Sequence, residues 1–192
     1  MGKSYSKALT LILILAVIIA AVLLYFQQNN HLHATAQDGV LKLSQRDFNA
    51  EGHLALSGEW EFYWGKFLDW NDFNSNSKPD PIHVKVPEVW DSFKQNGNKL
   101  TGFGYATYRL AVTVPESSAP LALRIGSIFT AYQCYVNDIL IAENGKISVS
   151  SKGEEPSCKP VTAFFLPPAE EFDLIIHVSN FTRAQGGISE EI

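Results

Sequence analysis

The stretch "GEWEFYW", Gly58–Trp64, carries aromatic residues at every second position. Successive side chains of a β-strand point to opposite faces, so Trp60, Phe62 and Trp64 share one face. The opposite face carries Glu59, Glu61 and Tyr63. We expect the face with two carboxylates to meet water and the aromatic face to pack inward, where each ring buries about 150–250 Å². An exposed platform that stacks on a ligand is the alternative interpretation of this stripe.

The same alternation is clearest in "YATYRLAVTV", Tyr105–Val114, where the even-numbered positions form an apolar face that includes Tyr108. Asn137-Asp138 separates two short apolar runs and is typical of a hairpin turn, because both residues tolerate positive φ. Further short strands are expected at Val40–Leu43, Leu54–Leu56, Ile82–Val86, Leu121–Ile125, Tyr132–Val136, Ile139–Ala142, Val161–Leu166 and Leu174–Val178. With about ten short strands and no long helix after residue 30, the sequence predicts an all-β sandwich or barrel.

An uncharged apolar segment, Ala8–Phe26, follows Lys3 and Lys7. At about 1.5 Å per residue, a helix of this length matches the ~30 Å hydrocarbon core of a bilayer. The lysines favour a cytoplasmic N-terminus. The "ATA" at 34–36 fits a signal-peptidase site, so an uncleaved anchor and a cleaved signal both stay open. Both place residues 37–192 outside the cytoplasm.

These features predict four segments. Residues 1–7 are cytoplasmic, 8–26 form a transmembrane or signal-anchor helix, 27–38 form a linker, and 39–192 form the extracytoplasmic sandwich. Contact with the membrane is therefore expected through residues 8–26.

The chain is acidic, with a formal net charge of −5. No basic cluster occurs in residues 37–192, and binding to a phosphate backbone needs a positive patch, so nucleic acid is not an expected partner. Cys134 and Cys158 would lie in an oxidising compartment. A disulfide between them and two free thiols both stay open, because their spacing does not decide between the two.

No catalytic or cofactor motif is present in the sequence. Glu59 and Glu61 stand two apart on one predicted strand and point the same way, whereas a glycosidase places two carboxylates across a bond, about 5–9 Å apart. His31 and His33 lie in the linker and would hold a metal only weakly. We therefore expect a non-enzymatic domain without cofactor or metal.

Five residues are candidates for ligand binding: Trp90, Tyr105, Arg109, Asn180 and Arg183. They offer the aromatic, amide and guanidinium groups that polar small molecules need, near loops that carry Pro or Gly. The alternative role for Trp90 is a plug for the end of the sandwich, and the alternative for Arg109 is one half of a local ion pair. The loops at 71–80 and 146–155 look merely solvated by comparison.

Five motifs, in this order, resemble a known family. They are "LSGEWEFYWGKFL", "VKVPEVW", "GFGYATYRLAVTVP", "LALRIGSIFTAYQCYVNDILIAENG" and "LIIHVSNFTRAQGG". The family is the extracytoplasmic jelly-roll domain, a galactose-binding-like sandwich, of bacterial seven-transmembrane receptors with diverse intracellular signalling modules. The resemblance covers residues 40–187 and implies a periplasmic sensor of a carbohydrate or organic acid, held at the inner membrane.

A weaker similarity runs to the N-terminal sugar-binding domain of glycoside hydrolase family 2, with Asn137-Asp138 where both families favour Asn-Gly. The resemblance to the receptors breaks off after Gly186-Gly187, so a sandwich incomplete at its C-terminal end is expected, with "SEEI" beginning a further strand. Two functions follow from these observations. One is a ligand-sensing domain of a signalling receptor, and the other is an anchored interaction or carbohydrate-binding module that contacts an envelope protein and has no signalling output.

Overall fold

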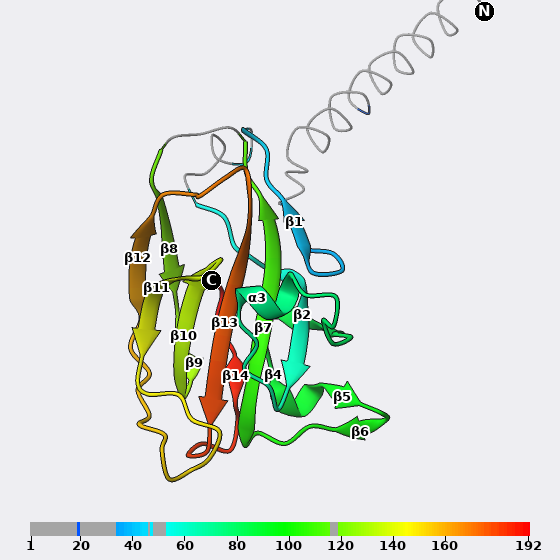
Figure 1. The fold of residues 1–192 in the computed structure, drawn as a ribbon, viewed down its shortest axis with the longest axis vertical. Coiled ribbons are helices and arrows are strands. Elements are labelled where there is room, and N and C mark those ends of the chain that lie inside the picture. The colour runs from blue at the N-terminus through cyan, green and yellow to red at the C-terminus, as the bar shows by residue number, and fades with distance from the viewer. Residues whose placement is uncertain (1–18, 20–33, 46, 48–52, 116–118) are drawn as a thin grey trace, which may run out of the picture. The chain divides into compact units, whose positions relative to one another are not determined.

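A seven-stranded sheet forms the main layer of the computed structural model, which describes residues 19, 34–45, 47, 53–115 and 119–192 (Figure 1). Its strands follow the order β11-β10-β13-β7-β2-β3, with β1 added in parallel beside β7. The strands are β1 (Val40–Lys42), β2 (Gly58–Trp64), β3 (Ile82–Val86), β7 (Gly104–Thr113), β10 (Ala131–Val136), β11 (Ile139–Asn144) and β13 (Glu171–Asn180). The central strands β7 and β13 pair antiparallel along their whole length.

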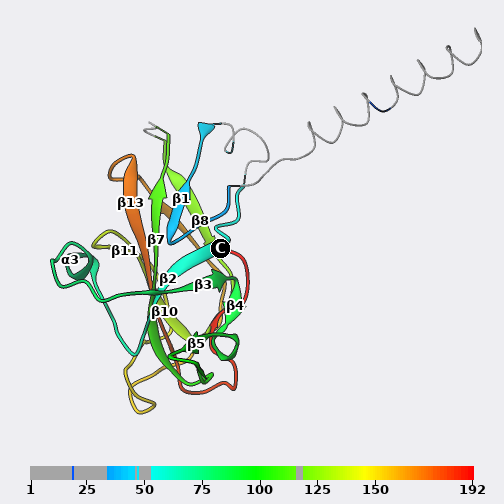
Figure 2. The same ribbon diagram turned by 90° about the vertical axis from the view of Figure 1, so that its right-hand side faces the viewer.

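Two smaller sheets lie over one face of this layer. They are formed by β8 (Leu121–Ile125) with β12 (Val161–Phe165), and by β14 (Gly187–Ile188) between β4 (Glu88–Val89) and β9 (Ile128–Phe129). Figure 2 shows β8 and β4 on one side of the main sheet and the short helix α3 (Trp70–Phe73) on the other. With 47% strand and 7% helix, the predicted all-β sandwich is confirmed.

The core between the layers is rich in aromatic rings. Trp60 and Phe62 are 0% and 1% exposed, and Phe62 packs edge-on against Tyr108 with ring centroids 4.8 Å apart. Trp64 is partly buried and stacks on Phe62 at 6.1 Å. The alternation in "GEWEFYW" therefore places its aromatic face in the core, as predicted, rather than on an exposed platform.

The other face of β2 differs from the expectation. Glu61 and Tyr63 are 8% and 3% exposed, so the prediction that this face meets water is wrong for both residues. The segment after β2, including α3, lies over them, and Tyr63 packs with Phe73 and Ile175 in a second buried cluster. Each face of the main sheet is therefore covered near β2.

The loops and the short elements complete the domain. A small hairpin joins β5 (Lys94–Gln95) to β6 (Asn98–Lys99), and a 3-10 turn, η1, spans Trp90–Ser92. Asn137 adopts a φ of 54° in the turn between β10 and β11, as its residue type predicts. The expected strand beginning at Ser189 is not formed, since β14 ends at Ile188, although Ile192 is buried. Cys134 and Cys158 are free.

Residues Ala34–Ile192 make up a compact unit that contains the core described above. Apart from Ile19, the predicted membrane helix at 8–26 lies outside the described residues. Within the described ranges, no helix has the length and apolar character needed to cross a bilayer.

Candidate functional site

Trp90 closes one end of the sandwich. It is 0% exposed, and its Nε1–H donates to the hydroxyl of Tyr108 at 2.8 Å. Gly186 lies so close that a Cβ there would approach the indole ring to 2.5 Å, and the Trp90 amide donates to the Gly186 carbonyl at 2.9 Å. Of the two roles considered for Trp90, the structure therefore favours the plug.

Asn180 and Arg183 lie at this same end, where Asn180 organises the turn that follows β13. Its Nδ2 donates to the carbonyls of Gly102 and Arg183, and its Oδ1 accepts from the Arg183 amide. Asn180 is 0% exposed, so its amide is used inside the protein. Arg183 is exposed, and its guanidinium lies 5.4 Å from the centre of the Phe129 ring.

The loop at 146–155 supports this turn rather than being merely solvated, as the sequence suggested. Glu154 accepts hydrogen bonds from the Ser179 hydroxyl at 2.8 Å, the Phe181 amide at 2.9 Å and the Thr182 hydroxyl at 3.1 Å. A single carboxylate thus ties two loops together.

Tyr105 and Arg109 lie on the outer face of β7, four positions apart and so separated by roughly 13 Å. Tyr105 contacts Phe67, with ring centroids 5.0 Å apart. Phe67 in turn contacts His177. Burial lowers the pKa of His177, and this effect outweighs the contact of its Nε2 with the Leu68 carbonyl at 2.8 Å, which raises that pKa. The structure therefore brings Trp90, Asn180 and Arg183 together but does not gather all five candidates into one site.

Arg109 belongs to a charged cluster beneath α3, which we call the ion cluster: Glu61, Tyr63, Lys78, Arg109 and Asp173. Arg109 reaches Glu61 at 2.8 Å and Asp173 at 2.7 Å, and Lys78 reaches Glu61 at 2.8 Å. The Tyr63 hydroxyl donates to Glu61 at 2.8 Å. The local ion pair is thus the role that the structure gives to Arg109, and Lys78 shows that the loop at 71–80 is not merely solvated.

Protonation in the ion cluster follows from these contacts. Burial alone would raise the pKa of Glu61, but hydrogen bonds from Lys78, Arg109 and Tyr63 outweigh it and lower that pKa. Burial alone would lower the pKa of Arg109, and its two carboxylate partners raise it instead. These groups therefore stay charged and neutralise one another, which suits a structural role.

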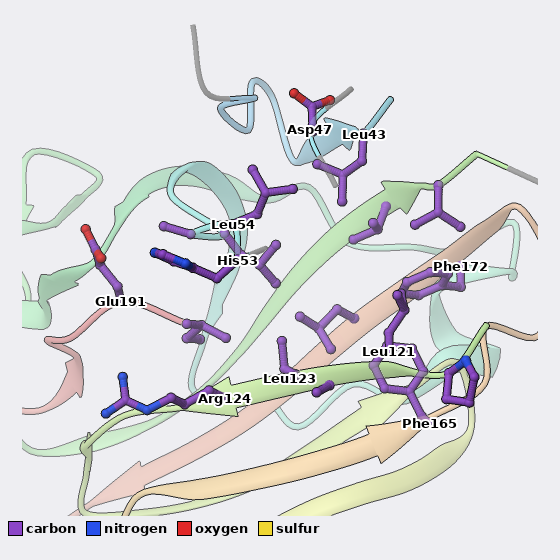
Figure 3. Close-up of a pocket in the computed structure, with 18 residues that line it drawn as sticks. Leu43, Asp47, His53, Leu54, Leu121, Leu123, Arg124, Phe165, Phe172 and Glu191 are labelled. Carbon is purple, nitrogen blue, oxygen red and sulfur yellow. The ribbon is translucent and has the colours of Figure 1, made fainter. Parts of the chain in front are cut away.

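A cavity of about 590 Å³ opens at the opposite end of the sandwich (Figure 3). It lies where β7 ends and β13 begins, and β7 runs about 30 Å from the Trp90 end to this one. Its apolar lining consists of Leu43, Leu54, Ala55, Leu56, Val112, Val114, Pro120, Leu121, Ala122, Leu123, Phe165, Phe172, Leu174 and Ile192. Phe165 and Phe172 meet edge-on, with centroids 5.7 Å apart.

Four polar residues line the same cavity: Asp47, His53, Arg124 and Glu191. In Figure 3, Arg124 and Glu191 lie at one margin with His53 beside them, apart from the phenyl rings. Arg124 is exposed, and its guanidinium makes no hydrogen bond or ion pair with any residue in the described part of the chain. The cavity therefore combines apolar walls with a guanidinium that is free to meet a ligand.

The alternation of β8 explains how one strand supplies both features. Leu121 and Leu123 face the interior, while Arg124 faces outward beside the opening. The predicted site residues do not line this cavity. Arg124 was missed because an outward arginine on an alternating strand looks like any solvated residue.

The described lining of the cavity contains two carboxylates, an imidazole and a guanidinium, and no cysteine, serine or threonine. Among the residues that the structure describes, no group of three or more His, Cys, Asp or Glu side chains is placed to hold a metal ion.

No protein-family model matches this chain, and no curated protein matches it either. Solved structures share its fold. A β-glucuronidase from an uncultured Clostridium sp. aligns with 70% of this chain and 27% of its own, at 20% identity and a TM-score of 0.51. A β-glucuronidase from Faecalibacterium prausnitzii aligns with 66% of this chain and 20% of its own, at 23% identity and a TM-score of 0.50.

At these identities the likeness concerns the fold alone. It agrees with the weaker of the two resemblances, the one to a domain of glycoside hydrolase family 2. This chain spans only 20–27% of the length of those enzymes. The resemblance to the seven-transmembrane receptors stays a prediction.

Proposed function

We propose that residues 34–192 form a non-catalytic ligand-binding module, with the cavity at the β7–β13 end as its binding site. The cavity itself is the observation that carries this proposal. Its volume of about 590 Å³ lies within the roughly 300–1,000 Å³ of small-molecule sites. Apolar walls with a few polar groups at the margin are also the usual composition of such sites.

We further propose that the module is the extracytoplasmic, periplasmic part of a single-pass membrane sensor that reports ligand binding to a signalling output. The apolar run at 8–26 behind two lysines supports the anchor and its orientation. The five motifs shared with the seven-transmembrane receptors support the sensory role. A sugar-binding-like fold supports a small-molecule ligand, with fold likeness giving the weakest of these three arguments.

The binding proposal is tested by a thermal-shift screen of purified residues 34–192 against saccharides, organic acids and amphiphiles. Val112 lines the cavity and is 4% exposed, so Val112→Phe fills part of the volume. Val136, on β10, is 2% exposed and does not line the cavity, so Val136→Phe is a matched control for overpacking. We expect a compound that stabilises the wild type and Val136→Phe but not Val112→Phe.

Two results contradict this proposal. One is a compound whose thermal shift survives in Val112→Phe and is lost in Arg183→Ala, which places binding at the Trp90 end. The other is a broad screen in which no compound stabilises the wild type.

An interaction module is the second candidate function. Phe164 and Leu166, in and just after β12, are 76% and 60% exposed, and apolar side chains this exposed favour contact with a partner. This alternative predicts no thermal shift in the screen. It also predicts that a photo-reactive residue at position 164 crosslinks to one envelope protein in cells, whereas scattered or absent crosslinks would contradict it.

A further inference from the structure

We infer that the ligand of the cavity is an amphiphilic carboxylate, with an apolar chain or ring between the sheets and its carboxylate at Arg124. This inference rests on the proposed function, since it names the class of ligand for the same site. It differs from the carbohydrate that the fold likeness suggests.

The apolar walls of the cavity favour an apolar chain or ring as the main part of the ligand. Leu123, Val112 and Phe172 come from three strands of two layers, and each has a hydrocarbon side chain. A saccharide buries many hydroxyl groups, and a buried hydroxyl without a partner costs free energy. An apolar chain leaves no polar group unpaired against such walls, and its transfer out of water is favourable in free energy.

Arg124 favours a carboxylate as the head group of the ligand. Its guanidinium presents a planar fork of donors that fits a carboxylate with two parallel hydrogen bonds, and none of the described residues bonds to that fork. Glu191 lies at the same margin and carries the opposite charge. An anionic head should therefore be attracted by Arg124 and repelled by Glu191, whereas an ammonium head would feel the reverse.

These charges give signed expectations for variants. Arg124→Gln should weaken the binding of decanoate roughly tenfold, because a hydrogen bond to a charged group is lost. Glu191→Gln should tighten it about twofold to fivefold, the range for exposed charge pairs. Arg183→Gln removes an exposed guanidinium at the other end of the sandwich and should change nothing.

The apolar body gives a second, independent expectation. Each methylene that leaves water is worth a similar increment, so decanoate should bind roughly tenfold tighter than octanoate. Decanol has the same chain without the charge. Decanol should bind to the wild type more weakly than decanoate does. Its affinity for Arg124→Gln should equal its affinity for the wild type.

Isothermal titration calorimetry of residues 34–192 tests these expectations, with octanoate, decanoate, decanol and decylamine below their micelle concentrations. The chain-length gain together with opposite effects of Arg124→Gln and Glu191→Gln on decanoate would support the inference. Tighter binding of decylamine than decanoate, or no effect of Arg124→Gln, would overturn it, and both variants change exposed side chains that the core does not need.

Failure of this inference is distinguishable from failure of the proposed function. If decanoate does not bind while another compound from the screen binds and is lost in Val112→Phe, the cavity is a binding site for a different class of ligand. If neither decanoate nor any compound of the screen binds, both proposals are wrong.

Discussion

Glu61→Gln tests whether the ion cluster holds the outer face of the main sheet together. The substitution keeps the size of the side chain and removes its charge. In the folded protein Glu61 is 8% exposed and accepts from Lys78, Arg109 and Tyr63, each at 2.8 Å. The sequence pattern predicts a small effect, because it places Glu61 in water, so the two interpretations differ clearly.

The expected loss of stability depends on which contacts the partners of Glu61 retain in the variant. Removing one member of a buried ion pair costs about 3–5 kcal/mol when the other charge is left unpaired. Here Arg109 keeps Asp173 at 2.7 Å, and the Lys78 side chain is 30% exposed and can be hydrated. The glutamine also offers one carbonyl oxygen as an acceptor. We therefore expect a loss of about 2–3 kcal/mol, the range of one strong hydrogen bond to a charged group.

Urea unfolding of residues 34–192, followed by tryptophan fluorescence, measures this loss. With a slope of about 2 kcal/mol/M, the midpoint should fall by roughly 1 M. Glu59→Gln is the matched control, because Glu59 is only partly buried, lies on the same face of β2, and has a carboxylate without an ion pair to the described residues. It should change stability by less than about 0.5 kcal/mol. Equal midpoints for the wild type and Glu61→Gln would refute the structural role of the ion cluster.

The same pair of proteins gives a dependence on pH with a definite sign. The pKa of Glu61 is lowered in the folded state, so its contribution to stability is present above the pKa of an unfolded glutamate. That contribution is lost as the pH falls through the folded value. The difference in stability between wild type and Glu61→Gln should therefore be largest near neutral pH and shrink on acidification. A difference that stays constant down to the folded pKa would contradict this account.

Three further predictions concern other parts of the chain. Trp60→Ala should destabilise residues 34–192 by about 3–5 kcal/mol, because a fully buried ring is replaced by a cavity; an unchanged urea midpoint would contradict its core position. Trp90→Phe should cost about 1–3 kcal/mol through loss of the hydrogen bond to the Tyr108 hydroxyl and of ring volume, yet leave ligand binding at the cavity end unchanged in calorimetry. The segment at 8–26 should keep the full chain in the membrane pellet after carbonate extraction, and recovery in the soluble fraction would contradict the anchor.

Much of the fold could be predicted because its strands alternate in sequence. The run Tyr105–Val114 differs from β7 by one residue at each end, and Ile82–Val86 and Leu121–Ile125 match β3 and β8. The two-residue strands β4, β9 and β14 were not predicted. They are defined by pairing between segments far apart in the chain, which leaves no local periodicity.

The candidate site was harder to predict, because burial depends on what covers a face. Glu61 has the local pattern of a solvated carboxylate, and only the fold brings Arg109 to it from 48 positions along the chain and places Asp173 beside Arg109. Trp90 lies in a turn, which suggested a ligand contact, yet Gly186 leaves room for its ring to be buried. The cavity depends on the separation of two layers, a quantity that no single strand encodes.

The two ends of the sandwich differ in how completely their side chains fill the space between the layers. At the Trp90 end, indole and glycine are in contact, and the amide of Asn180 is fully used by the backbone. At the other end, the layers leave about 590 Å³ beside a guanidinium without a described partner. The ion cluster lies on the outer face of the main sheet, whereas Val112 points into the interior, so the side chains of the two regions lie on opposite faces of the sheet. Changes in the ion cluster should therefore alter stability and changes in the cavity should alter binding, with effects that add rather than couple.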